Sequence, residues 1–147
     1  MLSPDPLHPL WHTPLGVYQW EQAADVNPLL ARVCQSMRAT DPNHVPGAPF
    51  YASDDKLLHR VKLTEWQAFI AFLVDSLRQT VVLANQGVWP TQAPGMRIGM
   101  EGIWFQIANG GTHHDIHTHG NCSWSGVYCI QVDDAAARAQ HPSFALH

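Results

Sequence analysis

Apolar positions in the first third of the chain recur at helical spacing. They are Leu29, Leu30, Val33 and Met37. Residues three and four apart lie on the same face of a helix, so this pattern predicts a helix over 28–39 with one face on the core. Asn27-Pro28 stands directly before the run. We interpret Asn27 as the N-cap and Pro28 as the first helical residue.

A longer apolar stripe follows in the middle of the chain. Its members recur at intervals of three and four: Trp66, Phe69, Ile70, Leu73, Leu77 and Val81. Thr64 and Gln67 match the capping-box pattern of a helix start, and Asn85-Gln86-Gly87 is typical of a helix end. The sequence therefore predicts a helix that begins near Thr64 and packs its stripe, including Trp66, in the core.

The second half of the chain changes to strand-like patterns. Short β-leaning stretches cover 97–101, 103–108 and 124–132, and a weaker alternation covers 15–20. Helices first and strands second predict an α+β fold, in which N-terminal helices pack on an antiparallel sheet. We expect one domain over 1–147, with a helical part at 1–96 and a sheet part at 97–147.

Composition and charge exclude several classes of function. The chain has 147 residues, of which 46% are hydrophobic and 14% charged, which suits one domain with its own core. The formal net charge is −4 and only eight Lys and Arg are present, without a basic run, so neither a nucleic acid nor an anionic membrane surface is expected as a partner. We see neither an apolar stretch of the ~20 residues that a membrane span needs nor a secretory signal. Three unpaired cysteines fit a reduced, cytoplasmic protein.

Candidate chemistry is concentrated in a histidine-rich segment after a Gly-Gly turn. Its members are His113, His114, Asp115, His117 and His119. In a strand, residues two apart share a face and lie ~7 Å apart, so one i, i+2 pair can converge on a metal ion. Residues four apart lie ~13 Å apart and cannot easily do so. The candidate pairs are His117 with His119, Asp115 with His117, and His113 with Asp115; the alternative is a solvated, histidine-rich loop.

Three motifs in this half resemble a known family. They are Trp-Phe-Gln-Ile-Ala-Asn-Gly-Gly at 104–111, His-Thr-His at 117–119 and Ser-Gly-Val-Tyr at 125–128. Together they are similar to a group of bacterial and phage proteins described as 2-oxoglutarate- and iron(II)-dependent oxygenases. Segments 11–15 and 51–58 are also similar to the N-terminal half of that group.

The resemblance implies a double-stranded β-helix (jelly roll), here a partial one, with helices packed on one sheet. It implies iron(II) held by His117 and His119, with 2-oxoglutarate bound to the same iron. Asp115 would be the carboxylate ligand or a hydrogen-bond acceptor for an imidazole. We expect Asp115 and Tyr128 to serve catalysis, and Trp104, Trp124 and Tyr128 to line the cofactor pocket. For Trp104, as for Trp66, we favour core packing over a place in an interface with a partner. The substrate would be a small molecule or a peptide.

Other interpretations stay open. Such oxygenases need a later histidine and a basic residue, whereas the part from Arg97 onward has room for about four of the ~8 strands of a jelly roll. The chain would then be a fragment, a small relative completed by a second subunit or a second copy, or a relative without catalysis. A zinc site of His117, His119 and Cys122, with Cys129 nearby, is a second interpretation. A binding or assembly protein without catalysis is a third.

Overall fold

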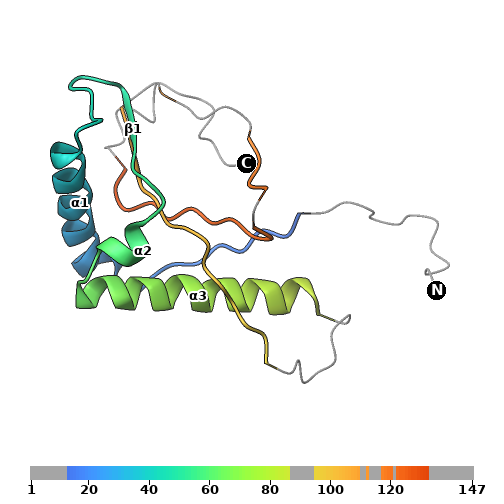
Figure 1. Cartoon of the computed structure of the whole chain (residues 1–147). Coiled ribbons are helices and arrows are strands. Elements are labelled where there is room, and N and C mark those ends of the chain that lie inside the picture. Colours follow the sequence, from blue (N-terminus) through green and yellow to red (C-terminus); the bar gives the residue numbers. More distant parts are fainter. Residues whose placement is uncertain (1–12, 87–94, 110–111, 113–116, 121, 133–147) are drawn as a thin grey trace, which may run out of the picture.

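Two long helices are the largest elements of the structure, and a small sheet lies beside them (Figure 1). The computed structural model describes residues 13–86, 95–109, 112, 117–120 and 122–132. The elements, in chain order, are α1 (Ala23–Thr40), β1 (Phe50–Ala52), α2 (Leu57–Arg60), α3 (Thr64–Ala84) and β2 (Gln106–Ala108). The predicted mixed α+β class is confirmed. The described elements are helices and one two-stranded antiparallel sheet.

Helix α1 confirms the first predicted helix but begins earlier than predicted. It starts at Ala23, so Pro28 lies inside the helix and not at its first position. The predicted cap at Asn27 is wrong, because the N-cap is Gln22 and Asn27 lies inside the helix. Its side chain instead accepts a hydrogen bond from the Tyr128 hydroxyl at 2.8 Å. Val26, Leu30 and Cys34 form the buried face of α1. Burial raises the pKa of the Cys34 thiol to about 11, which fits a thiol that packs as a small apolar side chain.

Helix α3 confirms the second predicted helix. It begins at Thr64 and ends at Ala84, where the Asn85 side-chain amide donates to the Val81 carbonyl at 2.7 Å. The predicted capping box is wrong, because the N-cap is Leu63 and no side-chain hydrogen bond caps this end. Thr64 is thus one residue too late to cap the helix.

Within the described residues, α3 alone is long and apolar enough to cross a membrane, judged by length and composition. Core helices of soluble proteins pass the same test, so this is weak evidence. The helix also carries an ion pair, Arg78 to Asp75 at 3.2 Å, near the middle of its length. Charged residues are costly inside a bilayer. The expectation that no stretch is long and apolar enough for a membrane span is therefore wrong by this criterion, while the absence of a membrane partner stays a prediction.

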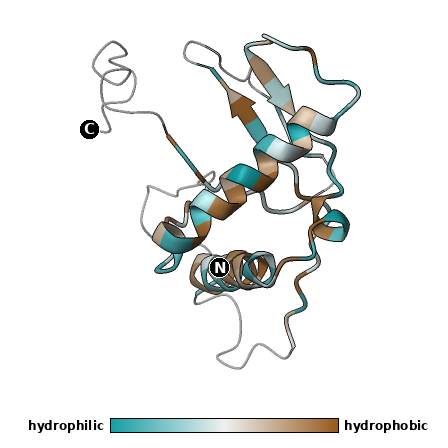
Figure 2. Ribbon diagram, turned by 90° about the vertical axis from the view of Figure 1, so that its left-hand side faces the viewer, coloured by the Kyte–Doolittle hydropathy of each residue, from teal (hydrophilic) through white to brown (hydrophobic). Residues whose placement is uncertain are grey.

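The core lies where α1, α2 and α3 meet the segment before β2. Leu30 is 1% exposed and Trp66 is 4% exposed, which confirms Trp66 as a core residue. The other buried members of the cluster are Val26, Cys34, Leu57, Val61, Phe69 and Phe105. In Figure 2, where α3 is seen end-on and α1 crosses above it, apolar and polar stretches alternate along α1. This is the pattern of a helix with one face on a core.

The sheet pairs β1 with β2 in antiparallel register, with Tyr51 opposite Ile107. This confirms a strand within 103–108, and Ile103 adds an isolated parallel bridge to Lys56. The strands predicted at 15–20, 97–101 and 124–132 are wrong, since the backbone forms no ladder with another strand in any of these three described stretches. Over 95–100, exposed and partly buried residues alternate without any ladder. In this stretch the alternation of exposed and partly buried residues therefore indicates that one side of the chain is buried, and not that the chain pairs with another strand.

The loop after α1 is tied to β1 by a short hydrogen bond. The Tyr51 hydroxyl donates to the Asp41 carboxylate at 2.6 Å, and the Asn43 backbone N–H donates to the other oxygen of Asp41 at 2.8 Å. The hydrogen bond from Tyr51 is the largest cause that lowers the pKa of Asp41 below 3.8. Desolvation, followed by the hydrogen bond to Asp41, raises the pKa of Tyr51 to about 12.

This contact predicts a dependence of stability on pH at both extremes. A lowered Asp41 pKa stabilises the fold above the ordinary value of 3.8, and this contribution is lost as pH falls through the folded pKa. A raised Tyr51 pKa stabilises the fold below pH 10, and this contribution is lost as pH rises to about 12. Titration of the phenolate absorbance should show one of the three tyrosines ionising near pH 12. Tyr51→Phe should remove that step, and a wild-type chain whose tyrosines all ionise near pH 10 would contradict the contact.

Candidate functional site

Two of the predicted metal ligands lie side by side. The ring centroids of His117 and His119 are 5.0 Å apart, with the planes at 70°. Imidazole nitrogens bind a divalent ion at about 2.0–2.1 Å, so two rings on one ion have centres roughly 5 Å apart. The chain over 117–119 is not part of a sheet, so the strand geometry considered for this segment does not bring the two rings together. The predicted approach of the two imidazoles is nevertheless what the structure has.

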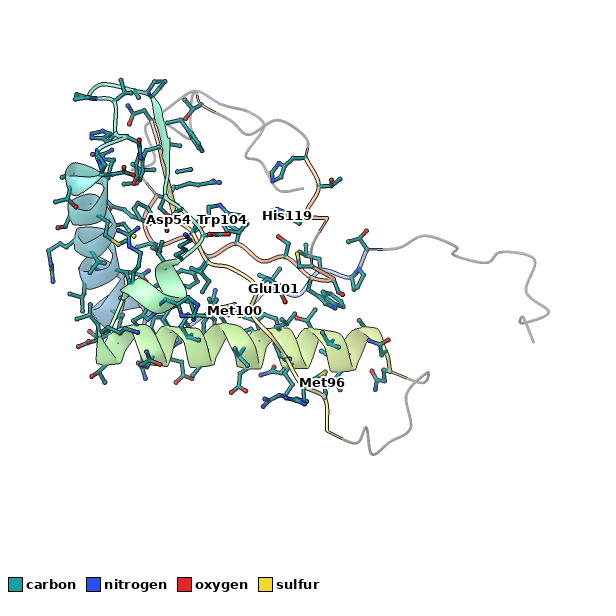
Figure 3. The ribbon with its side chains drawn as sticks, viewed as in Figure 1. Asp54, Met96, Met100, Glu101, Trp104 and His119 are labelled. Carbon is teal, nitrogen blue, oxygen red and sulfur yellow. The ribbon has the colours of Figure 1, made fainter. Side chains whose placement is uncertain are left out.

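Trp104 packs against His119. The two ring centroids are 5.6 Å apart and the planes are tilted by 32°. Figure 3 shows the two labelled side chains close together, on the side of the sheet-forming segment away from α1. Trp104 is 39% exposed, so the predicted core packing of Trp104 is wrong. Phe105, the next residue, is buried, and an extended backbone then turns Trp104 to the opposite side.

A third protein ligand is not found in the part of the chain that the structure describes. No group of three or more His, Cys, Asp or Glu there could hold a metal ion. Asp115 and His113 lie outside the described residues, so their predicted pairs stay predictions. Cys122 is exposed, and its sulfur lies 4.0 Å from the His119 carbonyl oxygen. Imidazole side chains such as those of His117 and His119 are donors of the kind that divalent transition metals take.

Tyr128 lies in an aromatic cluster that joins both ends of the described chain. Its ring centroid is 4.8 Å from Phe69, 6.1 Å from Phe72 and 6.2 Å from Trp20. Its hydroxyl donates to the Asn27 side chain, 101 residues earlier. Desolvation raises the pKa of Tyr128, with the hydrogen bond to Asn27 acting in the opposite direction. These contacts hold the 124–132 segment against α1 and α3, while a role of Tyr128 in catalysis stays a prediction.

The other predicted pocket residue, Trp124, is partly buried, and Ser125, Gly126 and Val127 after it are exposed. Next to Tyr128, a shallow groove of about 430 Å³ runs between α1 and the chain at 130–131. Its lining residues are uncharged: Ala23, Ala24, Asn27, Pro28, Ala31, Ile130 and Gln131. The groove and the role of Asn27 could not be predicted from a local sequence pattern, because both depend on residues about a hundred positions apart.

No family model, no curated protein and no solved structure matches this chain.

Proposed function

We propose that this chain is a non-haem iron(II) protein of the 2-oxoglutarate-dependent oxygenase type, or part of such a protein, with His117 and His119 as metal ligands. The observation that supports this proposal most directly is the 5.0 Å separation of the two imidazole rings. The similarity of the segments at 104–111, 117–119 and 125–128 to such oxygenases is a second support. Of the metals that two imidazoles could bind, this similarity favours iron(II), with 2-oxoglutarate as the cosubstrate.

Each residue of the site would have a separate role. His117 and His119 would each give one neutral nitrogen, and Asp115 would give the carboxylate that a facial triad requires. Bound iron with 2-oxoglutarate and O₂ would supply the oxidising power to hydroxylate a C–H bond of a small molecule or peptide. The indole of Trp104, whose ring centroid lies 5.6 Å from that of His119, would keep the His119 imidazole in position. Trp124 and Tyr128 would line the pocket beside the cosubstrate.

The jelly roll belongs to the same proposal. In it, β1 and β2 would be one pair of a larger sheet, since a two-stranded sheet by itself is marginally stable. Further strands would come from residues outside the described part or from a second subunit. Phe105, just before β2, belongs to the same buried cluster as residues of α1 and α3, and this supports helices as the layer that would pack on the larger sheet.

The first test is metal binding and cosubstrate turnover by the anaerobically purified chain. With Fe(II) and 2-oxoglutarate we expect metal uptake and, on addition of O₂, formation of succinate. His117→Ala and His119→Ala should each weaken metal binding by more than about 100-fold, since even residues that only orient ligands contribute 10–100-fold. The matched control is His59→Ala, because His59 is an exposed histidine at the end of α2. Equal metal uptake by all four proteins would refute the site.

A zinc site is a second candidate, favoured by the position of Cys122. The thiol lies close to the backbone of His119, with the sulfur 4.0 Å from the carbonyl oxygen. Thiolate sulfur is a softer ligand than carboxylate oxygen and selects zinc over iron. Cys122→Ser should leave iron uptake and succinate formation unchanged if the oxygenase proposal is correct. Loss of bound zinc and of stability in that variant would favour the zinc site instead.

A further inference from the structure

The outer edge of β2 carries backbone groups that are not paired within the described structure. The Asn109 N–H donates to the Pro49 carbonyl at 2.8 Å, and the Ser53 N–H donates to the Phe105 carbonyl at 3.0 Å. In an antiparallel ladder, alternate residues point their hydrogen-bonding groups to the same side. Residues 105, 107 and 109 therefore face β1. The N–H and C=O groups of Trp104, Gln106 and Ala108 face away from it.

The side chains along this edge do not protect it from another strand. Trp104, Gln106 and Ala108 are all exposed and uncharged. Natural edge strands are usually blunted by lysine, by proline or by a bulge, because unpaired edges attract further strands. The stretch 104–108 contains neither lysine nor proline. The three residue pairs between β2 and β1 are consecutive, so no bulge interrupts them. The outward backbone groups of this edge are therefore suited to hydrogen bonding with another extended strand.

We propose that a second copy of this chain pairs with this edge, antiparallel and two-fold symmetric about Gln106. In this register Gln106 lies opposite Gln106 of the partner subunit, and Trp104 lies opposite Ala108 of the partner subunit. Each copy then donates three backbone hydrogen bonds and accepts three, so that all the outward groups of 104–108 are satisfied. Each large indole is placed beside a small methyl group, which avoids a clash between bulky side chains.

Self-pairing is favoured over an unrelated peptide because the edge is complementary to itself. When the strand is paired antiparallel with a second copy of itself, the large residue of each copy lies opposite the small residue of the other, and the central glutamines face each other. The paired sheet would have four strands, and three or more strands are what independent stability of a sheet requires. Trp104 also contacts His119, so the interface would lie directly beside the pair of imidazoles. The proposal does not depend on metal binding.

The test uses the full chain and a proline on each edge of the sheet. Sedimentation equilibrium should show a dimer that dissociates on dilution. Gln106→Pro removes an outward N–H and leaves the ladder with β1 intact, so it should weaken dimerisation by on the order of tenfold or more. The matched control is Ala52→Pro, because Ala52 is exposed on β1 and its N–H points to the opposite edge. This variant should dimerise as the wild type does.

Hydrogen exchange of the wild-type chain keeps the proposal testable if a variant fails to fold. The amides of Trp104, Gln106 and Ala108 should be protected at high concentration and exchange rapidly on dilution. A monomer at every concentration would overturn the proposal. So would a dimer that Ala52→Pro weakens as much as Gln106→Pro does. Protection of the three amides that does not change with concentration would assign the edge to a segment of the same chain, and would overturn it as well.

Discussion

Phe69→Ala should lower the free energy of unfolding by about 3–5 kcal/mol, the range found for a large aromatic side chain removed from a core. Phe69 is 5% exposed and its ring centroid lies 5.4 Å from Trp66, 5.7 Å from Trp20 and 4.8 Å from Tyr128. Its removal would leave a cavity between three aromatic rings. Urea denaturation followed by tryptophan fluorescence measures the loss.

The control for this change lies on the same helix. Val82 is 49% exposed near the C-terminal end of α3, so Val82→Ala should change the free energy of unfolding by only about 0.5 kcal/mol. Both variants alter helix propensity in the same direction, which leaves burial as the difference between them. Similar losses in the two variants would mean that the core is not centred on Phe69.

Tyr128 gives the second large effect, and two substitutions separate its ring from its hydroxyl. Tyr128→Ala should cost about 2–4 kcal/mol, because a partly buried aromatic side chain that contacts three other rings is lost. Tyr128→Phe should cost only about 0.5–1.5 kcal/mol, the net contribution of one hydrogen bond, here the 2.8 Å bond to Asn27. Thermal unfolding of both variants measures these losses.

The same pair of variants tests whether Tyr128 acts in catalysis. If its hydroxyl only anchors the 124–132 segment, Tyr128→Phe should form succinate at nearly the wild-type rate. Its effect on stability should then be non-additive with that of Asn27→Ala, since the two side chains share one hydrogen bond. A large loss of turnover in Tyr128→Phe, with little loss of stability, would instead support the predicted catalytic role.

The helices could be predicted because their signal is local. Three- and four-residue spacing reports burial of one helix face, and both Leu30 and Phe69 are buried as that spacing requires. The helix starts were less predictable. Asn27 and Thr64 have the right chemistry for caps, yet Asn27 bonds to Tyr128 and Thr64 lies one residue inside the helix.

Strand pairing could not be predicted from the same kind of pattern. Tyr51 pairs with Ile107, so the signal for this sheet is divided between distant parts of the chain. Stretches such as 124–132 alternate because one side of an extended chain packs on the helices, which a sequence pattern cannot distinguish from a ladder. The His117–His119 pair could be predicted because its spacing is local, whereas the contact of His119 with Trp104 joins two different segments.

The aromatic cluster has a consequence for how the chain folds as it is synthesised. It takes Trp20 from before α1 and Tyr128 from a segment made much later. Contacts of such high sequence separation slow folding, because a long loop must close before they form. During translation α1 and α3 would leave the ribosome with Trp20, Phe69 and Phe72 still uncovered. We expect the nascent chain to be a chaperone client until Tyr128 has emerged and docks on these rings.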